Sequence, residues 1–275
     1  MTDKPEKPKK TFLSDWELKQ MARLGRGIRV PDNAIISPLS RDWLEYGRPS
    51  PDAGCGPRNA ARGAGGEVAL RIKIAEIGRR LYSLGFVPAT DGNISARLDA
   101  DSVLITPSGV SKGSLTPENI TKIDMAGRLI SGKTPSSEYL LHLCFYRRRP
   151  DVMAVVHAHP PLATGLASAG EALDKPLTSE MIITLGKVPL AAYATPGTAE
   201  VTDSIESLVK DHNAIMLANH GVVTCGKDLE TAFYRMETVE QAAKITLVAE
   251  QLGGGRMIPP EKVAKLEEIR KKLGL

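Results

Sequence analysis

Two histidines close an apolar run near the middle of the chain. The run Val152–Val156 is mostly apolar, and His157-Ala158-His159 follows it directly. Side chains two residues apart on a strand point to the same side, so a strand here presents both imidazoles together. A third histidine, His220, follows a second apolar run, Ala214–Ala218. The pattern predicts two strands that each lead into a histidine.

A carboxylate lies close to this pattern in the sequence. Ser136-Ser137-Glu138 opens an amphipathic segment, which places Glu138 at the start of a predicted helix. Neutral imidazoles suit the borderline-soft zinc ion, and a displaceable oxygen ligand leaves room for a substrate. Three histidines and one glutamate are therefore a set typical of catalytic zinc. The sequence predicts one Zn²⁺ per subunit.

The rest of the composition indicates a soluble globular protein. The chain has 275 residues, 42% of them apolar, which is enough for one large domain or two small ones. No apolar run approaches the roughly 20 residues that cross a bilayer, and the charged segment 1–10 leads into no apolar region. The three cysteines form no CxxC pair, as in reduced proteins. We expect a cytoplasmic protein without a membrane partner.

The net charge of +4 argues against a nucleic-acid partner because of where it lies. Residues 1–65 contain 12 Lys and Arg against 8 Asp and Glu, out of 36 and 32 in the whole chain, which leaves 24 of each sign in residues 66–275. A nucleic-acid-binding body would carry a basic face with interleaved aromatic residues. The neutral body, with few aromatics, predicts no such partner.

Residues 1–65 are interpreted as an N-terminal extension, and residues 66–275 as the folded domain. Ser14 and Glu17 form a capping box that predicts a helix over 15–24, and Ser37-Pro38 predicts a second one through Leu44. A Gly- and Pro-rich linker follows over 45–66. The helices either pack on the domain or a neighbouring subunit, or form a docking peptide. The segment Ile35–Asp42 resembles terminal targeting stretches of bacterial microcompartment enzymes, which implies a shell as partner.

The domain itself mixes short strands with helices. Apolar residues recur at helical spacing from Leu70 to Leu84, and Gly85 ends that helix. Further helices are predicted over 136–149, from 162, and over 199–210, 228–252 and 259–273. Strands are predicted over 94–98, 103–106, 121–124, 128–130, 152–159, 188–193, 214–218 and 222–224. Hairpin-like pairs among them favour a largely antiparallel sheet covered by helices.

With these residues in place, the domain resembles the class II aldolase/adducin family over about residues 67–252. The resemblance rests on six motifs in the same order. They are Gly92-Asn93-Ile94-Ser95, Ile105-Thr106-Pro107-Ser108-Gly109, Pro135-Ser136-Ser137-Glu138, His157-Ala158-His159, Tyr193-Ala194-Thr195 with Gly197-Thr198, and Asn219-His220-Gly221. The family implies an α/β fold, a three-layer αβα arrangement around a predominantly antiparallel sheet. It also implies a homotetramer with active sites at subunit interfaces.

The resemblance also implies roles for individual residues. His157, His159 and His220 correspond to zinc ligands, and Glu138 to a fourth ligand or catalytic base. Tyr193 corresponds to a proton donor or acceptor on the aldehyde side. The phosphate-binding positions correspond to Asn93, Ser108, Gly109, Ser136 and Ser137. Helix N-termini and Gly-containing loops present several donors to a dianion, which is consistent with that last role.

The reaction implied is reversible cleavage of a small ketose 1-phosphate, such as L-fuculose 1-phosphate, to dihydroxyacetone phosphate and a short aldehyde such as lactaldehyde. Within the family the alternatives are a dehydratase, a sugar-acid-phosphate decarboxylase and a 4-epimerase, for which an Asp is expected at Glu138. A non-catalytic adducin-like interaction module is an alternative of another class. Unlike fuculose-phosphate aldolase, this chain has no tyrosine in its last residues, Lys271–Leu275.

Three further features receive ordinary structural interpretations. His142 and His212 are expected to be hydrogen-bonded core residues. His142 lies four residues after Glu138 on the same helix face, so a supporting role near the metal remains open for it. Arg147-Arg148-Arg149 is expected to be a solvated helix end that the helix dipole favours. Ser136 and Ser137 have a helix-capping interpretation as the alternative to phosphate binding.

Overall fold

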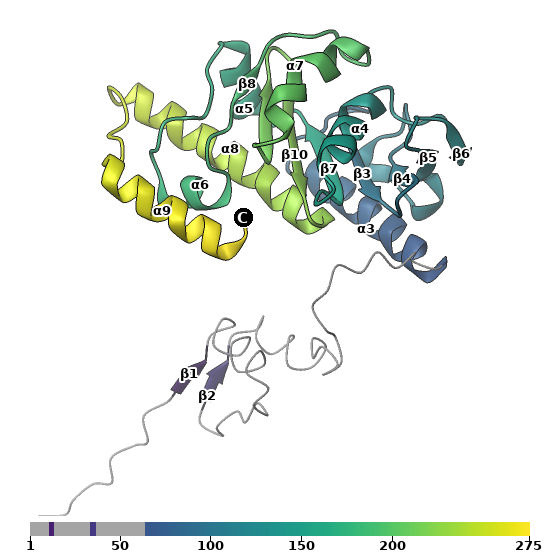
Figure 1. The fold of residues 1–275 in the computed structure, drawn as a ribbon, viewed down its shortest axis with the longest axis horizontal. Helices are drawn as coiled ribbons and strands as arrows, with labels where there is room; N and C mark the ends of the chain where they lie inside the picture. The colour runs from purple at the N-terminus through teal and green to yellow at the C-terminus, as the bar shows by residue number, and fades with distance from the viewer. Residues whose placement is uncertain (1–10, 14–33, 37–63) are drawn as a thin grey trace, which may run out of the picture. The chain divides into compact units, whose positions relative to one another are not determined.

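The structure is a computed structural model that describes residues 11–13, 34–36 and 64–275 (Figure 1). The chain divides into two units, Met1–Arg58 and Asn59–Leu275. In the first unit, β1 (Thr11–Leu13) and β2 (Ala34–Ile36) pair in parallel. The helices predicted over 15–24 and from Ser37 to Leu44 lie outside the described residues. The second unit contains all of the predicted site residues.

One eight-stranded sheet forms the centre of this unit, in the order β6-β5-β4-β3-β7-β10-β9-β8. Neighbouring strands are antiparallel, except that β8 and β9 are parallel. The strands are β3 (Asn93–Arg97), β4 (Ser102–Ile105), β5 (Thr121–Asp124), β6 (Leu129–Ser131), β7 (Ala154–Ala158), β8 (Leu190–Ala191), β9 (Ala214–Leu217) and β10 (Gly221–Gly226). The predicted antiparallel sheet is therefore confirmed.

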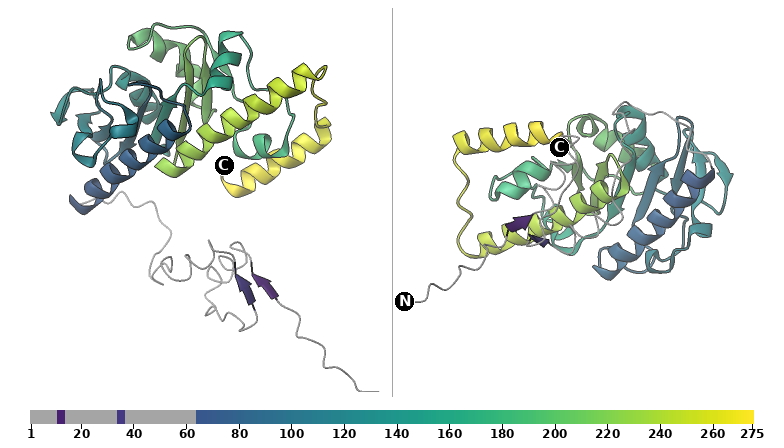
Figure 2. Two further views of the ribbon diagram at one scale, coloured as in Figure 1. Left: turned by 180° about the vertical axis from the view of Figure 1, so that it is seen from behind. Right: turned by 90° about the horizontal axis from the view of Figure 1, so that it is seen from below.

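Helices cover both faces of the sheet, so the predicted three-layer αβα arrangement is also confirmed. They are α3 (Ala64–Ser83), α4 (Tyr139–Arg148), α5 (Pro161–Ser168), α6 (Ser179–Thr184), α7 (Ala199–Val209), α8 (Leu229–Gln251) and α9 (Pro260–Leu273). Buried residues of α3, α5, α6 and α8 share one hydrophobic cluster, and those of α4 and α7 share the other. Figure 2 shows α3 and α8 across one side of the sheet. The last helix, α9, packs against α6.

Strand β7 shows how the sequence produces these layers. All five of its residues are buried, because helices cover both of its faces. Val155 belongs to the cluster under α4 and α7, whereas its neighbour Val156 belongs to the cluster under α3 and α8. Burying each valine side chain contributes about 1.5–3 kcal/mol to folding. The strand that carries His157 is thus packed on both of its faces.

Several element boundaries differ from the predictions. Helix α4 begins at Tyr139, after Ser136-Ser137-Glu138, and Glu138 is its N-cap. Strand β8 has two residues instead of the predicted six, and the short helix α6 was not predicted. Asp228 does cap α8 as predicted, and its side chain accepts a hydrogen bond from the backbone nitrogen of Thr231. None of the described helices combines the length and the apolar composition that a membrane span requires.

Candidate metal centre and active site

The three histidines converge at one end of two adjacent strands. His157 lies in β7, and β10 pairs with β7 so that Val223 is opposite His157 and Val222 opposite Ala158. His159 follows the end of β7 and His220 precedes the start of β10. Because the strands are antiparallel, the end of one meets the start of the other. The register therefore brings together residues that are far apart in the sequence.

The turn between β9 and β10 sets the position of His220. Asn219 adopts a left-handed conformation with φ 55°, which asparagine tolerates better than most residues. The backbone nitrogen of His220 donates to the carbonyl oxygen of Leu217 at 3.1 Å. The next residue, Gly221, packs so closely that a Cβ there would lie 2.6 Å from Ala158 O and 2.6 Å from His159 Cδ2. This position therefore requires glycine.

Three pairs among the four predicted ligands stand close to the separation found between the ligands of a tetrahedrally coordinated ion. The Nε2 atoms of His157 and His159 are 3.2 Å apart. Glu138 Oε2 is 3.4 Å from His157 Nε2, and Glu138 Oε1 is 3.2 Å from His220 Nε2. Ligand bonds of about 2.0–2.1 Å in a tetrahedron place neighbouring ligand atoms about 3.3 Å apart. One ligand nitrogen from each histidine lies within 4.8 Å of the other two.

The hydrogen bonds of the rings leave the facing nitrogens unprotonated. His157 Nδ1 donates to the carbonyl oxygen of Val222 at 2.9 Å, and His159 Nδ1 donates to Asp91 Oδ2 at 3.3 Å. Burial lowers the pKa of His157 to about 3 and lowers the pKa of His159, so both rings are neutral at pH 7. Two lone pairs thus face each other at the site. A divalent cation between them fits this arrangement.

Glu138 completes the set as an ionised carboxylate. Burial of the carboxyl group favours its neutral form, but His157, His220 and the amide of Asn93 outweigh burial and hold the pKa of Glu138 far below its usual value. Asn93 Nδ2 donates to Glu138 Oε2 at 2.7 Å. Among the described residues, Glu138 Oε1 is buried and accepts no hydrogen bond. A buried anionic oxygen left in this state fits a metal ligand, since such an oxygen otherwise costs folding free energy.

A buried chain of hydrogen bonds supports Glu138 from behind. His142 Nε2 donates to Asn93 Oδ1, and Ser95 Oγ donates to His142 Nδ1 at 2.6 Å. The hydroxyl of Tyr146 in turn donates to Ser95 Oγ at 2.7 Å. Burial lowers the pKa of His142 to about 4, so this ring is also neutral. The expectation of a hydrogen-bonded core histidine is confirmed for His142, and its bonds lead to the carboxylate.

Two backbone loops carry the predicted phosphate-binding residues and lie side by side. The backbone nitrogen of Ser108 donates to Thr134 O at 3.0 Å, and that of Ser136 donates to Thr106 O at 3.1 Å. A bridge between Pro107 and Pro135 joins the loops between these bonds. Ser108, Gly109 and Ser137 are exposed, whereas Ser136 is buried. The loops therefore offer donors at the surface next to the start of α4.

Asn93 occupies a different position from the other residues of the predicted phosphate set. Its side chain is buried, and both ends of its amide are engaged by Glu138 and His142. The structure thus brings the Asn93 side chain to the metal ligands, and it brings Ser108, Gly109, Ser136 and Ser137 to the paired loops. His159 and His220 keep 23% and 11% of their side-chain surface exposed, so solvent reaches the ligand set from outside.

Tyr193 lies at the surface of the chain. It follows β8, and 61% of its surface is exposed. The nearby Gly197 approaches the same part of the protein, since a Cβ there would lie 3.5 Å from the carbonyl oxygen of Ser137. The loop that contains both residues therefore lies beside the start of α4. Within the described residues, no hydrogen bond joins Tyr193 to the metal ligands.

Sequence reasoning missed two residues that contact the site. Asp91, which accepts the hydrogen bond of His159, stands in a turn 68 residues earlier in the chain. Lys112 is 2% exposed, and its Nζ donates to Thr90 O at 2.7 Å and to Val110 O at 2.9 Å. Burial lowers the pKa of Lys112 to about 8, although Asp91 and Glu138 oppose this. Its ammonium group joins the loop before β3 to the loop after β4, and no sequence pattern marks it.

Two other expectations need correction. His212 is only partly buried at the start of β9, where its Nδ1 donates to Lys187 O at 3.2 Å. Arg149 is not a solvated helix end, because only 16% of its side chain is exposed and its guanidinium binds Asp151 and Asn213. The start of β9 and the Asp151 turn cover it, and the helical pattern alone does not reveal these contacts.

The fold is αβα, and three histidines together with Glu138 meet at the end of its central strands as a candidate cation site. A family model, the class II aldolase and adducin N-terminal domain, matches residues 72–247. The chain belongs to the class II aldolase and adducin family. Relatives of this chain include enzymes named as a sugar-acid-phosphate decarboxylase and as a sugar-phosphate aldolase.

Three relatives illustrate the range of reactions. The 3-oxo-tetronate 4-phosphate decarboxylase of Escherichia coli K12 is 34% identical over 74% of this chain and 96% of its own length. The L-fuculose phosphate aldolase of Methanocaldococcus jannaschii is 36% identical over 63% of this chain and 93% of its own. The crystal structure of L-fuculose-1-phosphate aldolase from Thermus thermophilus has a TM-score of 0.61 at 32% identity, and the match covers 70% of this chain and 100% of that one.

Proposed function

We propose that the protein is a zinc-dependent lyase that breaks a carbon–carbon bond next to the carbonyl group of a small phosphorylated substrate. Our first candidate reaction is the reversible aldol cleavage of a ketose 1-phosphate, such as L-fuculose 1-phosphate or a related deoxyketose phosphate. The products are dihydroxyacetone phosphate and a short aldehyde such as lactaldehyde. One observation carries the proposal: three imidazole nitrogens and a buried carboxylate oxygen without a hydrogen bond stand at ligand separations beside two paired donor loops.

His157, His159, His220 and Glu138 would hold a zinc ion, which would supply Lewis-acid polarisation of the substrate carbonyl. The chain itself moves the proton: the ionised carboxylate accepts it from the carbon next to the carbonyl in the condensation direction, and the same proton is returned to that carbon in cleavage. The Glu138 carboxylate stands within 3.4 Å of two ligand nitrogens, and so beside any carbonyl held there. We assign to Glu138 the transfer of the proton at the carbon next to that carbonyl. Asn93 and His142 hold the carboxylate in position for this transfer.

The phosphate group of the substrate is assigned to the paired loops. Ser108, Ser136 and Ser137 offer hydroxyl groups, and Gly109 is exposed, with no atom within 4 Å of the place where a Cβ would stand. Oriented backbone and hydroxyl donors bind a dianion without an arginine or lysine. The buried ammonium group of Lys112 adds a positive charge behind these loops. Anchoring the phosphate fixes the distance from it to the carbonyl, which selects small substrates.

Decarboxylation of a 3-oxo acid phosphate is the second candidate, and one observation favours it. Aldol cleavage needs a group that takes the proton of the hydroxyl on the leaving side, whereas loss of carbon dioxide does not. Tyr193, the residue proposed for that proton, is 61% exposed, and no hydrogen bond joins it to the candidate metal ligands among the described residues. The relatives include 3-oxo-tetronate 4-phosphate decarboxylases. Loss of carbon dioxide from that compound also yields dihydroxyacetone phosphate, so the two candidates differ in the other product.

The deciding experiment follows both products from the same zinc-loaded enzyme. Ketose 1-phosphates and 3-oxo-tetronate 4-phosphate are supplied separately, and dihydroxyacetone phosphate, aldehyde and carbon dioxide are measured. Aldehyde in equal amount supports aldol cleavage, and carbon dioxide supports decarboxylation. Glu138→Gln keeps the shape of the side chain and is expected to lower turnover by at least about 10²-fold. Unchanged turnover in this variant contradicts the role of Glu138, and no product from any substrate favours an adducin-like interaction module.

The assembly and the extension complete the proposal. We infer a cytoplasmic homotetramer in which a neighbouring subunit covers the exposed side of the site near Tyr193, as the family resemblance implies. Light scattering of the full-length protein measures the mass of the assembly, and a monomer with full activity contradicts an interface site.

For residues 1–65 we propose a docking role with a microcompartment shell as the candidate partner. Residues 66–275 are proposed to be the complete catalytic domain.

A further inference from the structure

A second cavity lies at the end of the central strands opposite to the histidines. Its volume is about 310 Å³, within the range of small-molecule sites. It is bordered by Val152, which precedes β7, and by Gly226, which ends β10. At about 3.3 Å per strand residue, Val152 is about 16 Å from His157 along β7. The cavity, called here the arginine cavity, is lined by Arg149, Asp151, Val152, Asn213, Gly226, Lys227, Thr231, Arg235, Gly274 and Leu275.

Positive charge is concentrated at this end of the molecule. A neighbouring cavity of about 570 Å³ shares Arg149, Asn213 and Leu275 with the arginine cavity. The charged side chains of the two cavities are seven cations and three carboxylates: Arg149, Lys187, Lys210, Lys227, Arg235, Arg270 and Lys271 against Asp151, Asp211 and Glu267. Residues 66–275 as a whole carry 24 charges of each sign. The excess of four positive side chains is therefore local to this place.

Arg235 is the central residue of the arginine cavity. The residue as a whole is 6% exposed, and its Nη1 donates to the carbonyl oxygen of Cys225 at 2.6 Å. Its Nε atom is buried without a hydrogen-bond partner, and among the described residues no carboxylate lies within 4.0 Å of the guanidinium. A buried, always charged group without an anionic partner costs folding free energy. An anionic ligand would remove that cost.

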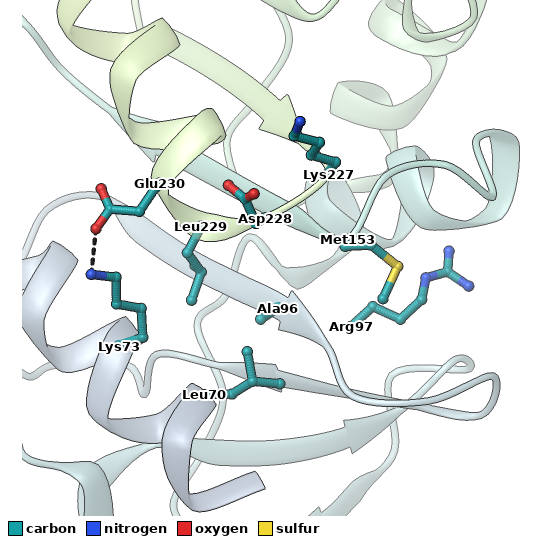
Figure 3. A pocket seen from close by; sticks show the side chains of 9 residues that line it. All are labelled: Leu70, Lys73, Ala96, Arg97, Met153, Lys227, Asp228, Leu229 and Glu230. Carbon is teal, nitrogen blue, oxygen red and sulfur yellow. Dashed lines mark ion pairs between the residues drawn. The ribbon is translucent and has the colours of Figure 1, made fainter. Parts of the chain in front are cut away.

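The carboxylates nearby are already engaged by other groups. Asp151 accepts two hydrogen bonds from Arg149, from Nε at 3.0 Å and from Nη2 at 2.6 Å. Asp228 caps α8, and Glu230 pairs with Lys73 on the far side of the helix start (Figure 3). Lys227 extends away from that pair and forms no ion pair with any described residue. Lys227 and Arg235 therefore keep their charge available for a ligand.

We propose that the arginine cavity binds the phosphate group of a small phosphorylated metabolite, at a site separate from the catalytic one. Guanidinium and ammonium groups are the side chains that recognise phosphate through charge-assisted hydrogen bonds. Arg235 provides the buried charge, Lys227 the charge at the rim, and Thr231 a hydroxyl. The oxygen of Leu275 accepts from Arg270 Nε at 3.2 Å, so this end of α9 contacts Arg270 rather than Arg235.

The test uses inorganic phosphate as the probe and the full chain with its catalytic phosphate loops disabled. In the double variant Ser136→Ala, Ser137→Ala, calorimetric titration is expected to retain one binding event per chain. Adding Arg235→Met to this background is expected to weaken phosphate binding at least tenfold. Lys227→Met, at the exposed rim, is expected to weaken it several-fold without affecting the fold. Lys244→Met, which removes one charge from an exposed position on the same helix, is the matched control.

Each result has a defined meaning. Loss of binding in Arg235→Met and Lys227→Met, with binding kept in Lys244→Met, supports the site. Absence of binding in the double variant, or an equal loss in all three charge variants, overturns it. If Arg235→Met does not fold, Lys227→Met alone decides. Comparing phosphate with glycerol 3-phosphate separates the sources: tighter binding of the ester supports a metabolite, and tighter binding of free phosphate contradicts the metabolite as ligand.

Discussion

The amide of Asn93 connects two parts of the site that the sequence places far apart. One end donates to Glu138, and the other accepts from His142. Because a neutral amide has a fixed donor end and a fixed acceptor end, the bond to His142 determines which end faces the carboxylate. The chain from Tyr146 through Ser95 and His142 therefore orients the Asn93 amide and, through it, the Glu138 carboxylate, to which none of the three forms a hydrogen bond. Such supporting bonds are as consequential for metal sites as the ligands themselves.

Replacing His142 tests this orientation. In His142→Leu, Asn93 loses its acceptor-side partner and can rotate, so we expect turnover to fall about 10- to 100-fold. His142→Gln carries an amide that still donates to Asn93, and we expect it to recover most of the loss. Zinc content and turnover are measured on each variant. Equal turnover in the leucine and glutamine variants, at equal zinc content, would show that His142 only fills space.

Lys112 gives a prediction about pH. The pKa of its buried ammonium is about 8 in the folded protein, against an ordinary value of 10.5. Below pH 8 both states are protonated, and burying the charge costs folding free energy. Between pH 8 and 10.5 only the unfolded chain keeps the proton, so stability rises with pH. Relative to Lys112→Met, the free energy of unfolding should rise by about 2–3 kcal/mol between pH 7 and pH 10.

This experiment needs only denaturant titrations of the two proteins at the two pH values. Other titrating groups are common to both, so their contributions cancel in the difference. A difference that stays constant with pH would mean that the Lys112 ammonium ionises in the fold as it does in water.

The convergence of the candidate ligand residues was predictable from the sequence for a local reason. The spacing of His157 and His159 and the strand pattern before each histidine are visible within a few residues. Asp91 and Lys112 were not predictable, because their contacts depend on which strands pair and on loops that the pairing brings together. Asn93 was predicted to bind phosphate, but its side chain contacts Glu138 and His142. That contact depends on the β3–β7 register, which the sequence does not show.

Strands β7 and β10 pack closest where they carry the ligands, and Gly221 makes this possible. A methyl group there would lie 2.6 Å from the backbone oxygen of Ala158 and from the ring of His159. We expect Gly221→Ala to displace the His159 ring and to lower zinc affinity at least tenfold, at a stability cost of about 1–3 kcal/mol. Zinc content after dialysis against a weak chelator measures the effect.

Gly165→Ala is the control for this substitution. Gly165 lies in α5, where a Cβ has no atom within 4 Å, so the added methyl group should leave zinc binding unchanged. Helical alanine in place of glycine stabilises by about 0.5–1 kcal/mol. Full zinc retention by Gly221→Ala would show that the strands separate without disturbing the ligands.

Long periodic elements were predicted more accurately than short ones. The predicted helix that ends before Gly85 agrees with α3, and the predicted helix that Asp228 caps agrees with α8. In both, the helical spacing of apolar residues and the capping residue predict the same helix. Helix α6 has six residues, too few to show a period, and its apolar side chains pack on the larger core. Strand β8 pairs through two residues only, so the apolar run over 188–193 predicted a strand longer than the one that forms. Tertiary contacts, rather than local pattern, set these boundaries.

The complete chain divides into two units, and the ligands all belong to the second. We therefore expect that deletion of residues 1–62 leaves zinc content and turnover unchanged, since α3 begins at Ala64. The measurement compares metal analysis and initial rates of the full and shortened chains at equal concentration. Loss of both properties would assign the extension to the catalytic body, and loss of turnover alone would point to a contribution to an interface site.

The pairing of β7 with β10 would also make binding of the proposed cation a check on correct folding. A register slip of one residue would turn His157 toward the opposite face of the sheet and away from His159 and His220. A misfolded chain that retains its secondary structure would then lack the coordination geometry. Metal retention during refolding should therefore appear only when native strand alignment is reached, after helix content has already recovered. Metal binding would therefore report native strand pairing rather than the compactness of the chain.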